Sequence, residues 1–132
     1  MQAAKQSRVS KSEIARVAVK LFFGITEKWD LTDEQCCVLA GLSSRATLTR
    51  WRDNLDAHKP IRLGKDTLER LSYIAGIYSA LQTLFSMQPH SQEWIHKPNE
   101  DFGGQSALQR MLRGNVVDLA DIRRYLDSWL EV

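Results

Sequence analysis

The stretch that decides the fold is TDEQCCVLAGLSSRATLTRWRDNL, residues 32–55. Its first part has the spacing of a capping box, because Thr32 and Gln35 can each satisfy a free amide at the start of a helix. An apolar run follows and ends at Gly41, which is suited to the positive φ found just after a helix. We therefore expect a short helix that begins after Thr32 and ends at a glycine turn.

A second short helix follows the turn. Ser43 or Ser44 caps it, and its inward face is formed at positions i, i+3 and i+7 by Leu48, Trp51 and Leu55. Two short helices joined by a glycine turn form a helix-turn-helix, in which the second helix enters the DNA major groove. The pattern also occurs in helical proteins that bind no DNA, so the outward face has to support the assignment.

The outward face of that second helix is polar. An arginine at its start lies where recognition helices meet base edges, and hydroxyl side chains suit phosphates and bases. The predicted DNA-binding residues are Ser44, Arg45, Thr47, Thr49 and Arg50. The alternative is that these are ordinary solvated side chains, and Asp53 near the same face would repel phosphate.

The sequence before the helix-turn-helix predicts a longer helix. Ser10 and Glu13 have capping-box spacing, and the helix should end near Trp29. The apolar residues expected to face the core recur at helical period: Ile14, Val17, Ala18, Leu21, Phe22 and Ile25. The eleven residues 1–11 hold Lys5, Arg8 and Lys11 without an acid and are expected to form a flexible basic arm.

The sequence after residue 56 also reads as helices. An aperiodic linker at residues 56–64 is followed by a long helix, whose stripe is Leu68, Leu71, Ile74, Ala75, Tyr78, Leu81 and Phe85. Because Ile77 and Leu84 are apolar too, this helix should be covered on two sides. A short helix from Ser106 and a last helix over 116–130, with Trp129 or Leu130 inward, complete an all-α chain. We expect a flexible arm at 1–11, a DNA-binding domain at 12–60 and a second helical domain at 61–132.

Composition and motifs argue against several classes of protein. The 132 residues carry a formal net charge of +2, with the excess in the first half, where residues 1–60 hold 10 Lys and Arg against 7 Asp and Glu. No segment approaches the roughly 18 apolar residues of a membrane span, so we expect a soluble, cytoplasmic protein without a membrane partner. No phosphate-loop, HExxH or GxSxG motif is present, and Cys36 and Cys37 read as small core residues. We therefore expect no enzyme, no metal and no cofactor.

The chain resembles the Xre/MbcA/ParS antitoxins over residues 14–132. The resemblance rests on ITEKWDLTDEQ, AGLS and TLTRW between Phe22 and Trp51, on the helix DTLERLSYIAGIYSALQTLF, and on WIHKPNEDFGGQSAL from Trp94. It implies a partner toxin of the RES-domain type, which consumes NAD, and an antitoxin that closes the toxin's active site and represses its own operator as a dimer. Many members have Pro where this chain has Ala107, and both residues suit the first turn of a helix.

The resemblance also implies where the toxin binds. Carried over by position, the toxin-binding motif corresponds to Pro98, Asn99, Phe102, Gly103, Gly104, Ser106 and Leu108, together with the last helix. From the residues alone, Phe102 to Ser106 is a tight turn whose glycines let the backbone approach a neighbouring helix while Phe102 plugs the core. At the end of the chain we expect Trp129, Leu130 and Val132 to help fill the toxin's entrance. Asp127 and Glu131 are expected to meet the cationic groups that otherwise hold the phosphates of NAD.

Two other functions fit the same residues. The chain could be a stand-alone repressor whose second half only dimerises, or a small-ligand sensor that uses the Gly-Gly loop and Trp94. A homodimer is expected because two-fold dimers are the commonest oligomers and match pseudo-palindromic operators. The long helix over 68–85 is the candidate interface, although burial within one subunit would explain its apolar residues as well.

Overall fold

The computed structural model describes residues 10–131, except for the side chain of Gln88. The expected basic arm therefore lies almost entirely outside the described residues, and Lys11 is the first residue of a helix. The elements are α2 (Lys11–Lys28), α3 (Asp33–Ala40), α4 (Arg45–Asp56), α5 (Lys65–Leu84), α6 (Gln88–Glu93), η1 (Trp94–His96), η2 (Glu100–Phe102), α7 (Ala107–Met111) and α8 (Val116–Leu130). Across residues 10–131 the chain contains no strand, only one isolated bridge between Pro98 and Ser106, so the all-α prediction is confirmed.

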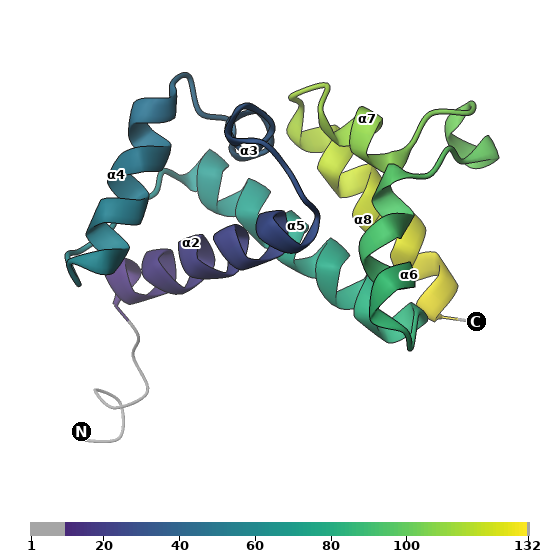
Figure 1. The fold of residues 1–132 in the computed structure, drawn as a ribbon, viewed down its shortest axis with the longest axis horizontal. Coiled ribbons are helices and arrows are strands. Elements are labelled where there is room, and N and C mark those ends of the chain that lie inside the picture. The colour runs from purple at the N-terminus through teal and green to yellow at the C-terminus, as the bar shows by residue number, and fades with distance from the viewer. Residues whose placement is uncertain (1–9, 132) are drawn as a thin grey trace.

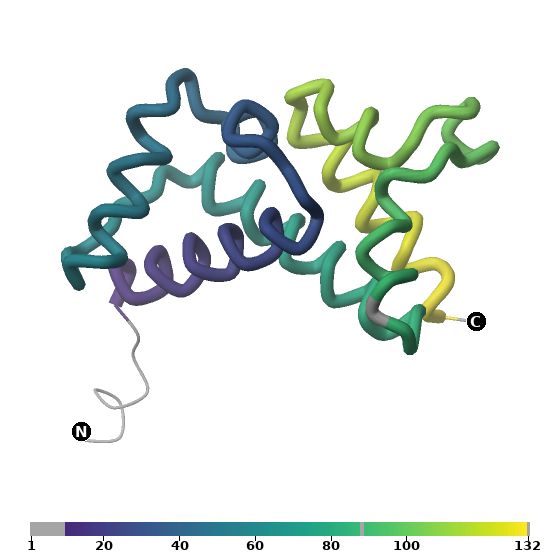
Figure 2. The backbone as a smooth tube through the Cα atoms, in the orientation of Figure 1, coloured from purple at the N-terminus to yellow at the C-terminus, as the bar shows by residue number. Residues whose placement is uncertain are grey.

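Helix α5 joins the two halves of the molecule. It packs most extensively on α8 and next on α2, and Figure 1 shows it between them. Its most deeply buried side chains include Ile74, Ile77 and Leu81. Figure 2 shows the N-terminal helices on one side of this helix and the C-terminal helices on the other. The prediction that the long helix is covered on two sides is confirmed.

The core face of α2 differs from the predicted stripe. Phe22 and Ile25 are buried as expected, but Ile14, Val17 and Leu21 are exposed. The buried face instead consists of Ala15, Val19, Phe22, Ile25 and Thr26. The Thr26 hydroxyl is satisfied inside the helix, since it donates to the Phe22 carbonyl oxygen at 2.9 Å. The periodicity identified the helix correctly but placed its core face incorrectly, because α2 carries two apolar faces.

The helix ends follow local chemistry. The Ser10 hydroxyl accepts from the Glu13 amide, and Thr32 and Gln35 form the complete predicted capping box. Gly41 ends α3 with a φ of 72°. These ends were predictable because each depends only on residues within one turn.

One expectation about the last third of the chain is wrong. Neither Trp129 nor Leu130 faces inward, and both are exposed at the end of α8.

Among the described residues, no helix has both the length and the apolar composition needed to cross a membrane.

Candidate functional site

Two short helices, α3 and α4, form the helix-turn-helix. Leu48 and Trp51 of α4 are buried, as their spacing predicted. Trp51 meets Phe22 and Phe23 of α2 edge-on, at centroid distances of 6.4 and 6.5 Å. Edge-to-face pairs of this kind stabilise packing beyond the area that they bury. They hold α4 against α2 and leave its opposite face to solvent.

The predicted DNA-binding residues lie mostly on that opposite face. Ser44 is the N-cap of α4, and its side chain makes no capping hydrogen bond in the described structure. Ser44, Arg45, Thr49 and Arg50 are exposed, whereas Thr47 is half-buried. The Thr47 hydroxyl accepts a hydrogen bond of 3.2 Å from the Arg50 guanidinium. The structure thus presents one continuous polar face with two arginines.

An acidic residue that sequence reasoning did not single out contacts this face. Asp33, at the start of α3, pairs with Arg45 at 3.2 Å and with Arg52 at 2.8 Å. The hydrogen bond from Arg52 lowers the pKa of Asp33 below its usual value, and Arg45 adds to the effect. The Arg52 guanidinium also lies over the Phe23 ring, 4.9 Å from its centroid. A phosphate or a base would therefore have to displace the Asp33 carboxylate to contact Arg45.

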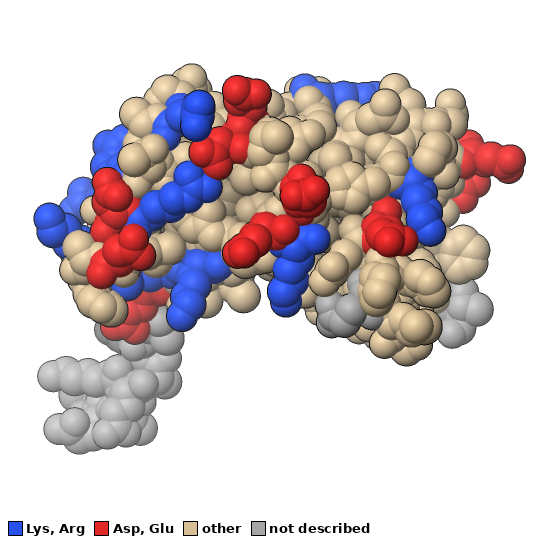
Figure 3. All heavy atoms as spheres, in the orientation of Figure 1, with Lys and Arg blue, Asp and Glu red and all other residues tan. Residues whose placement is uncertain are grey.

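The surface around the helix-turn-helix is not uniformly basic. On the face in Figure 3, cationic and anionic side chains are intermixed over the end formed by α2, α3 and α4. Asp53 and Asp56 are exposed on α4 itself. Non-specific attraction to phosphate is correspondingly weak, so DNA recognition by this face would depend on specific contacts.

The predicted toxin-binding loop is a tight turn built on two glycines. Gly103 and Gly104 have φ angles of 67° and 87°, a region that other residues rarely adopt. The Asn99 carbonyl oxygen accepts from the amides of Phe102 and Gly104, both at 3.0 Å. No described atom lies within 4 Å of a Cβ built on either glycine. The expected close approach to a neighbouring helix is therefore wrong, and the glycines are required by backbone conformation alone.

Aromatic side chains support this loop from beneath. Phe102 is buried, as expected, and its ring lies 4.8 Å from the Tyr125 ring and 6.2 Å from the Trp94 ring. Trp94 and Tyr125 are stacked with centroids 6.2 Å apart. The Tyr125 hydroxyl donates to Asp101 of the loop at 2.7 Å. Tyr125 was missed from the sequence, although it lies one turn before Trp129 on the same helix face.

Some of the predicted toxin-binding residues around the loop are exposed, and others are buried. Pro98, Gly103 and Gly104 are exposed, and Asn99 is half-buried. Ser106 and Leu108 are buried, and Ser106 forms a capping box with Gln109 at the start of α7. The buried residues therefore hold the backbone at the start of α7 and contribute no surface of their own.

The end of α8 presents the other predicted toxin-binding residues. Trp129 is 55% exposed, and its ring packs 6.3 Å from Tyr125. Asp127 pairs with Arg123 at 3.0 Å, and Leu130 and Glu131 are exposed. A hollow of about 290 Å³ opens beside them, lined by Leu84, Phe85, Trp94, Tyr125, Leu126 and Trp129. Val132 lies outside the described residues.

A half-buried arginine, Arg70, lies between two turns of the chain. The Arg70 guanidinium lies across Gly41, where a Cβ would come within 2.7 Å of its Nε. It donates to the Gly114 carbonyl oxygen at 3.0 Å and pairs with Asp66 at 2.9 Å. The turn of the helix-turn-helix is thereby tied to the turn between α7 and α8.

Catalytic chemistry finds little support in the described structure. Cys36 and Cys37 are buried core residues, as expected, and burial raises the pKa of both thiols. A thiol with a raised pKa is a poor nucleophile. Within residues 10–131 no three His, Cys, Asp or Glu side chains form a group that could hold a metal ion.

Comparison with known sequences identifies the class of protein. The sequence model of the antitoxin Xre-like helix-turn-helix domain matches residues 8–76. That of the antitoxin Xre/MbcA/ParS C-terminal toxin-binding domain matches residues 80–130. The chain belongs to the Xre/MbcA/ParS family of antitoxins, and it combines a helix-turn-helix domain with a toxin-binding domain. The resemblance inferred from the sequence motifs is confirmed.

A curated relative covers nearly the whole chain. It is "Uncharacterized protein y4oB" of Sinorhizobium fredii (strain NBRC 101917 / NGR234), 40% identical over 119 residues. The aligned region spans 89% of this chain and 88% of the relative. The similarity therefore includes both the helix-turn-helix and the toxin-binding domain.

Proposed function

We propose that this antitoxin inhibits a RES-domain, NAD-consuming toxin by placing the end of α8 over the toxin's active site. The observation that carries the proposal is the exposure of Trp129 and Leu130 at the C-terminal end of α8, in the turn that follows the buried residue Leu126. The Gly-Gly loop adjoins them through Tyr125, so loop and helix end form one surface. Exposed apolar side chains held by a rigid cluster are typical of interface anchors.

The charges beside this anchor suit a site that binds NAD phosphates. Asp127 and Glu131 lie on the same helix end. An antitoxin that enters such a site would meet the cationic groups that otherwise hold the phosphates. Acidic side chains complement these groups, which favours occlusion over binding at a remote surface.

The proposal is tested by the substitution Trp129→Ala, with the toxin that is encoded by the neighbouring gene as the partner. Trp129 is largely exposed, so its loss should change the free energy of unfolding by less than about 1 kcal/mol. Affinity for the toxin should fall at least about tenfold, as expected for an aromatic anchor. NAD consumption by the toxin, titrated with wild-type and variant antitoxin, measures the loss.

Val117→Ala is the matched control. Val117 is 57% exposed at the opposite end of α8, so it has a similar exposure but lies away from the proposed contact. It should neutralise the toxin like the wild type. If Trp129→Ala also neutralised the toxin at wild-type concentrations, occlusion by the end of α8 would be excluded. A chain that forms no toxin complex but still binds its promoter would favour the stand-alone repressor.

We further propose that the protein represses its own operator as a homodimer, with α4 in the major groove. The support is the exposed polar face that contains Ser44, Arg45, Thr49 and Arg50, with Thr47 beside Arg50. We retain residues 12–60 as the DNA-binding part and residues 61–132 as the part for dimerisation and toxin binding. This division describes function, since α5 packs on both parts.

Arg50→Ala tests the DNA contact. Arg50 is exposed and pairs with no carboxylate within the described residues, so it is the cation best placed to reach a base or a phosphate. Its loss should weaken binding to the promoter fragment about tenfold in a mobility-shift titration at fixed salt. Arg124→Ala, which removes an exposed arginine from α8, should bind like the wild type. Equal loss in both variants would indicate non-specific attraction rather than recognition by α4.

A further inference from the structure

The outward face of α4 carries a carboxylate that the fold of the subunit does not use. Asp53 is exposed and lies in the last turn of α4. A negative charge in the last turn of a helix opposes the helix dipole and is unfavourable for the helix itself. Within residues 10–131 the structure gives this carboxylate no ion pair and no hydrogen bond. Asp53 is therefore an acceptor without a structural role in one chain.

The arginines close to Asp53 in the sequence are directed elsewhere. Arg50, three residues earlier on the helix, is close enough for an ion pair with Asp53. Its guanidinium instead donates to the Thr47 hydroxyl at 3.2 Å, one turn further back. Arg52 pairs with Asp33 at 2.8 Å. The face of α4 thus presents a cationic donor and an anionic acceptor that do not neutralise each other.

The donor and the acceptor lie on one side of the helix. Ala46, Arg50 and Asp53 are separated by four and three residues, so they share a face that is turned away from the buried Leu48 and Trp51. Along the helix axis Arg50 and Asp53 are about 4.5 Å apart, since each residue adds about 1.5 Å. Successive base pairs of DNA are stacked about 3.4 Å apart. With α4 in the major groove, the two side chains reach neighbouring base pairs.

The two groups have different complements in the major groove. A guanidinium donates to O6 and N7 of guanine, whereas a carboxylate accepts from the N4 amino group of cytosine. A phosphate offers a carboxylate no donor, so a base is the part of DNA that Asp53 can bind. We propose that Asp53 reads a cytosine in the operator, at the base pair next to a guanine that Arg50 contacts. The inference rests on the proposed operator binding and names bases that this face selects.

The same carboxylate disfavours DNA of other sequences. Where no cytosine amino group is in reach, Asp53 approaches the phosphates without a donor, and like charges repel. This penalty applies to every sequence, and the cytosine contact offsets it only at the operator. Specificity that depends on a repulsive group of this kind is a difference between two affinities. Asp53 should therefore raise discrimination while it lowers affinity for DNA in general.

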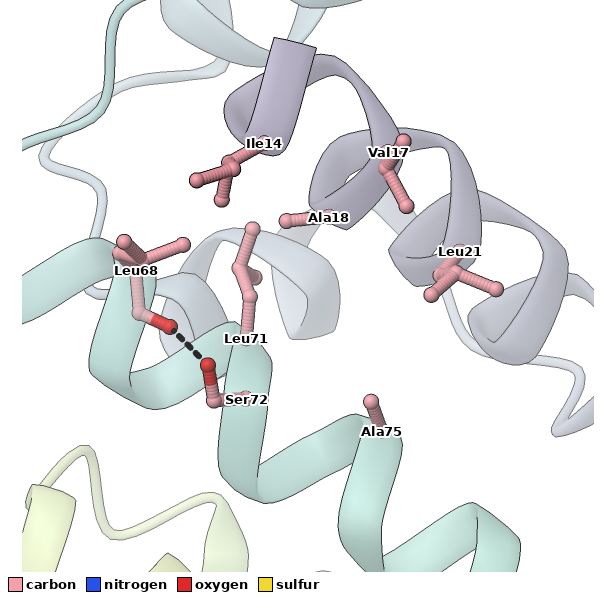
Figure 4. Close-up of a pocket in the computed structure, with 8 residues that line it drawn as sticks. All are labelled: Ile14, Val17, Ala18, Leu21, Leu68, Leu71, Ser72 and Ala75. Atoms are coloured by element: carbon pink, nitrogen blue, oxygen red, sulfur yellow. Dashed lines mark hydrogen bonds between the residues drawn. The ribbon is translucent and has the colours of Figure 1, made fainter. Parts of the chain in front are cut away.

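The groove between α2 and α5 carries no comparable set of groups. It measures about 340 Å³, and apart from Ser72 its lining residues are apolar (Figure 4). The Ser72 hydroxyl donates to the Leu68 carbonyl oxygen at 2.9 Å, so this one polar side chain is already satisfied. A base edge would find no charged donor or acceptor in the groove. Base readout by the first half of the chain is therefore assigned to α4.

The experiment compares promoter DNA with random DNA, using the full chain. A labelled promoter fragment competes with unlabelled DNA of random sequence and equal length, at fixed salt. Asp53→Ala should lower the ratio of the two affinities at least about tenfold, while affinity for random DNA stays equal or rises. Asp56→Ala is the matched control, because it removes the same charge from α4 beside a hollow lined by Phe23 and Leu55. It should keep the wild-type ratio.

A base-pair scan of the protected region identifies the contact. Replacement of one C·G pair should weaken wild-type binding about tenfold, and Asp53→Ala should be indifferent to that pair. Asp53→Asn should prefer A·T there, because a side-chain amide pairs with adenine. Circular dichroism should show the wild-type helix content in these variants, since Asp53 and Asp56 are exposed.

The outcomes separate this inference from the proposed function. A wild-type ratio for Asp53→Ala, or a scan identical to that of the wild type, would overturn the cytosine contact and leave operator binding intact. An equal fall in the ratio for Asp53→Ala and Asp56→Ala would also overturn it, because charge alone would then explain the effect. A wild type that binds the promoter no better than random DNA would overturn operator binding, and this inference with it.

Discussion

Asp33 carries two opposing roles at the recognition helix. It pairs with Arg45 and Arg52, which fixes the first turn of α4 relative to α3. The same carboxylate places a negative charge beside the face that would meet DNA. The residue thus favours the folded helix-turn-helix while it weakens attraction to phosphate.

Asp33→Asn should lower the free energy of unfolding at pH 7 by less than about 1 kcal/mol, because the ion pair is partly exposed. The pKa of Asp33 is lowered in the folded chain. Its stabilising contribution is therefore complete above the unfolded pKa of about 4, and is lost as the pH falls through the lower folded value. Urea unfolding at pH 7 and at pH 3 measures the effect, and the difference between wild type and variant should shrink at pH 3.

Asp30→Asn provides a control for that measurement. Asp30 is exposed and has a φ of 57°, a conformation that Asn tolerates. Its substitution should change the free energy of unfolding by no more than about 0.5 kcal/mol. If the difference caused by Asp33→Asn stayed constant between pH 7 and pH 3, the carboxylate would not stabilise the fold as an anion.

At the scale of single elements, the loop over η2 depends on α8. Phe102 packs on Tyr125, whose hydroxyl reaches back to Asp101. The conformation of the loop is thus set by a helix that begins fourteen residues beyond Phe102. Movement of the loop and of the exposed end of α8 should be coupled, because Tyr125 contacts both.

Tyr125→Phe removes the hydroxyl and keeps the ring. We expect a loss of about 1 kcal/mol in the free energy of unfolding, the usual size for one hydrogen bond. Amide hydrogen exchange in residues 99–105 should become faster while exchange in α5 stays unchanged. Tyr73→Phe is the control, because the structure gives no hydrogen bond to the Tyr73 hydroxyl within the described residues. Exchange in the loop at the wild-type rate would show that ring packing alone orders it.

The elements also show where sequence reasoning succeeds. The capping box at Thr32, the short helix that begins at Ser106 and the last helix, Val116–Leu130, were predicted because their signals are local. The core face of α2 was not, because Val17 and Val19 are equally apolar and only the packing of the other helices decides which of them is buried. Asp33 and Tyr125 were missed for the same reason, since their partners are far away in the sequence.

At the scale of the whole molecule, the shared α5 should make unfolding cooperative. Neither half keeps a complete core without this helix, because α2 and α8 both pack on it. Each half holds two tryptophans, with Trp29 and Trp51 in the first and Trp94 and Trp129 in the second. Fluorescence therefore reports on both halves, whereas circular dichroism reports on all the helices.

We expect one thermal transition, with coincident midpoints by fluorescence and by circular dichroism at a fixed protein concentration. A fragment that ends at Gly64 should not fold, because it lacks the helix against which α2 packs. Two separate transitions, or a folded fragment, would show that the helix-turn-helix is independent of α5.

The contact between Gly41, Arg70 and Gly114 restricts how the sequence can vary among related chains. The three residues lie on three separate turns or helices, yet the guanidinium of one occupies the space beside another and bonds the third. A larger residue at position 41 would displace Arg70 and leave the Gly114 carbonyl oxygen without that donor. Residue types at positions 41 and 70 should therefore change together in related chains, because a Cβ at position 41 meets the Arg70 side chain. Position 114 should vary independently of this contact, since it supplies only a backbone carbonyl oxygen.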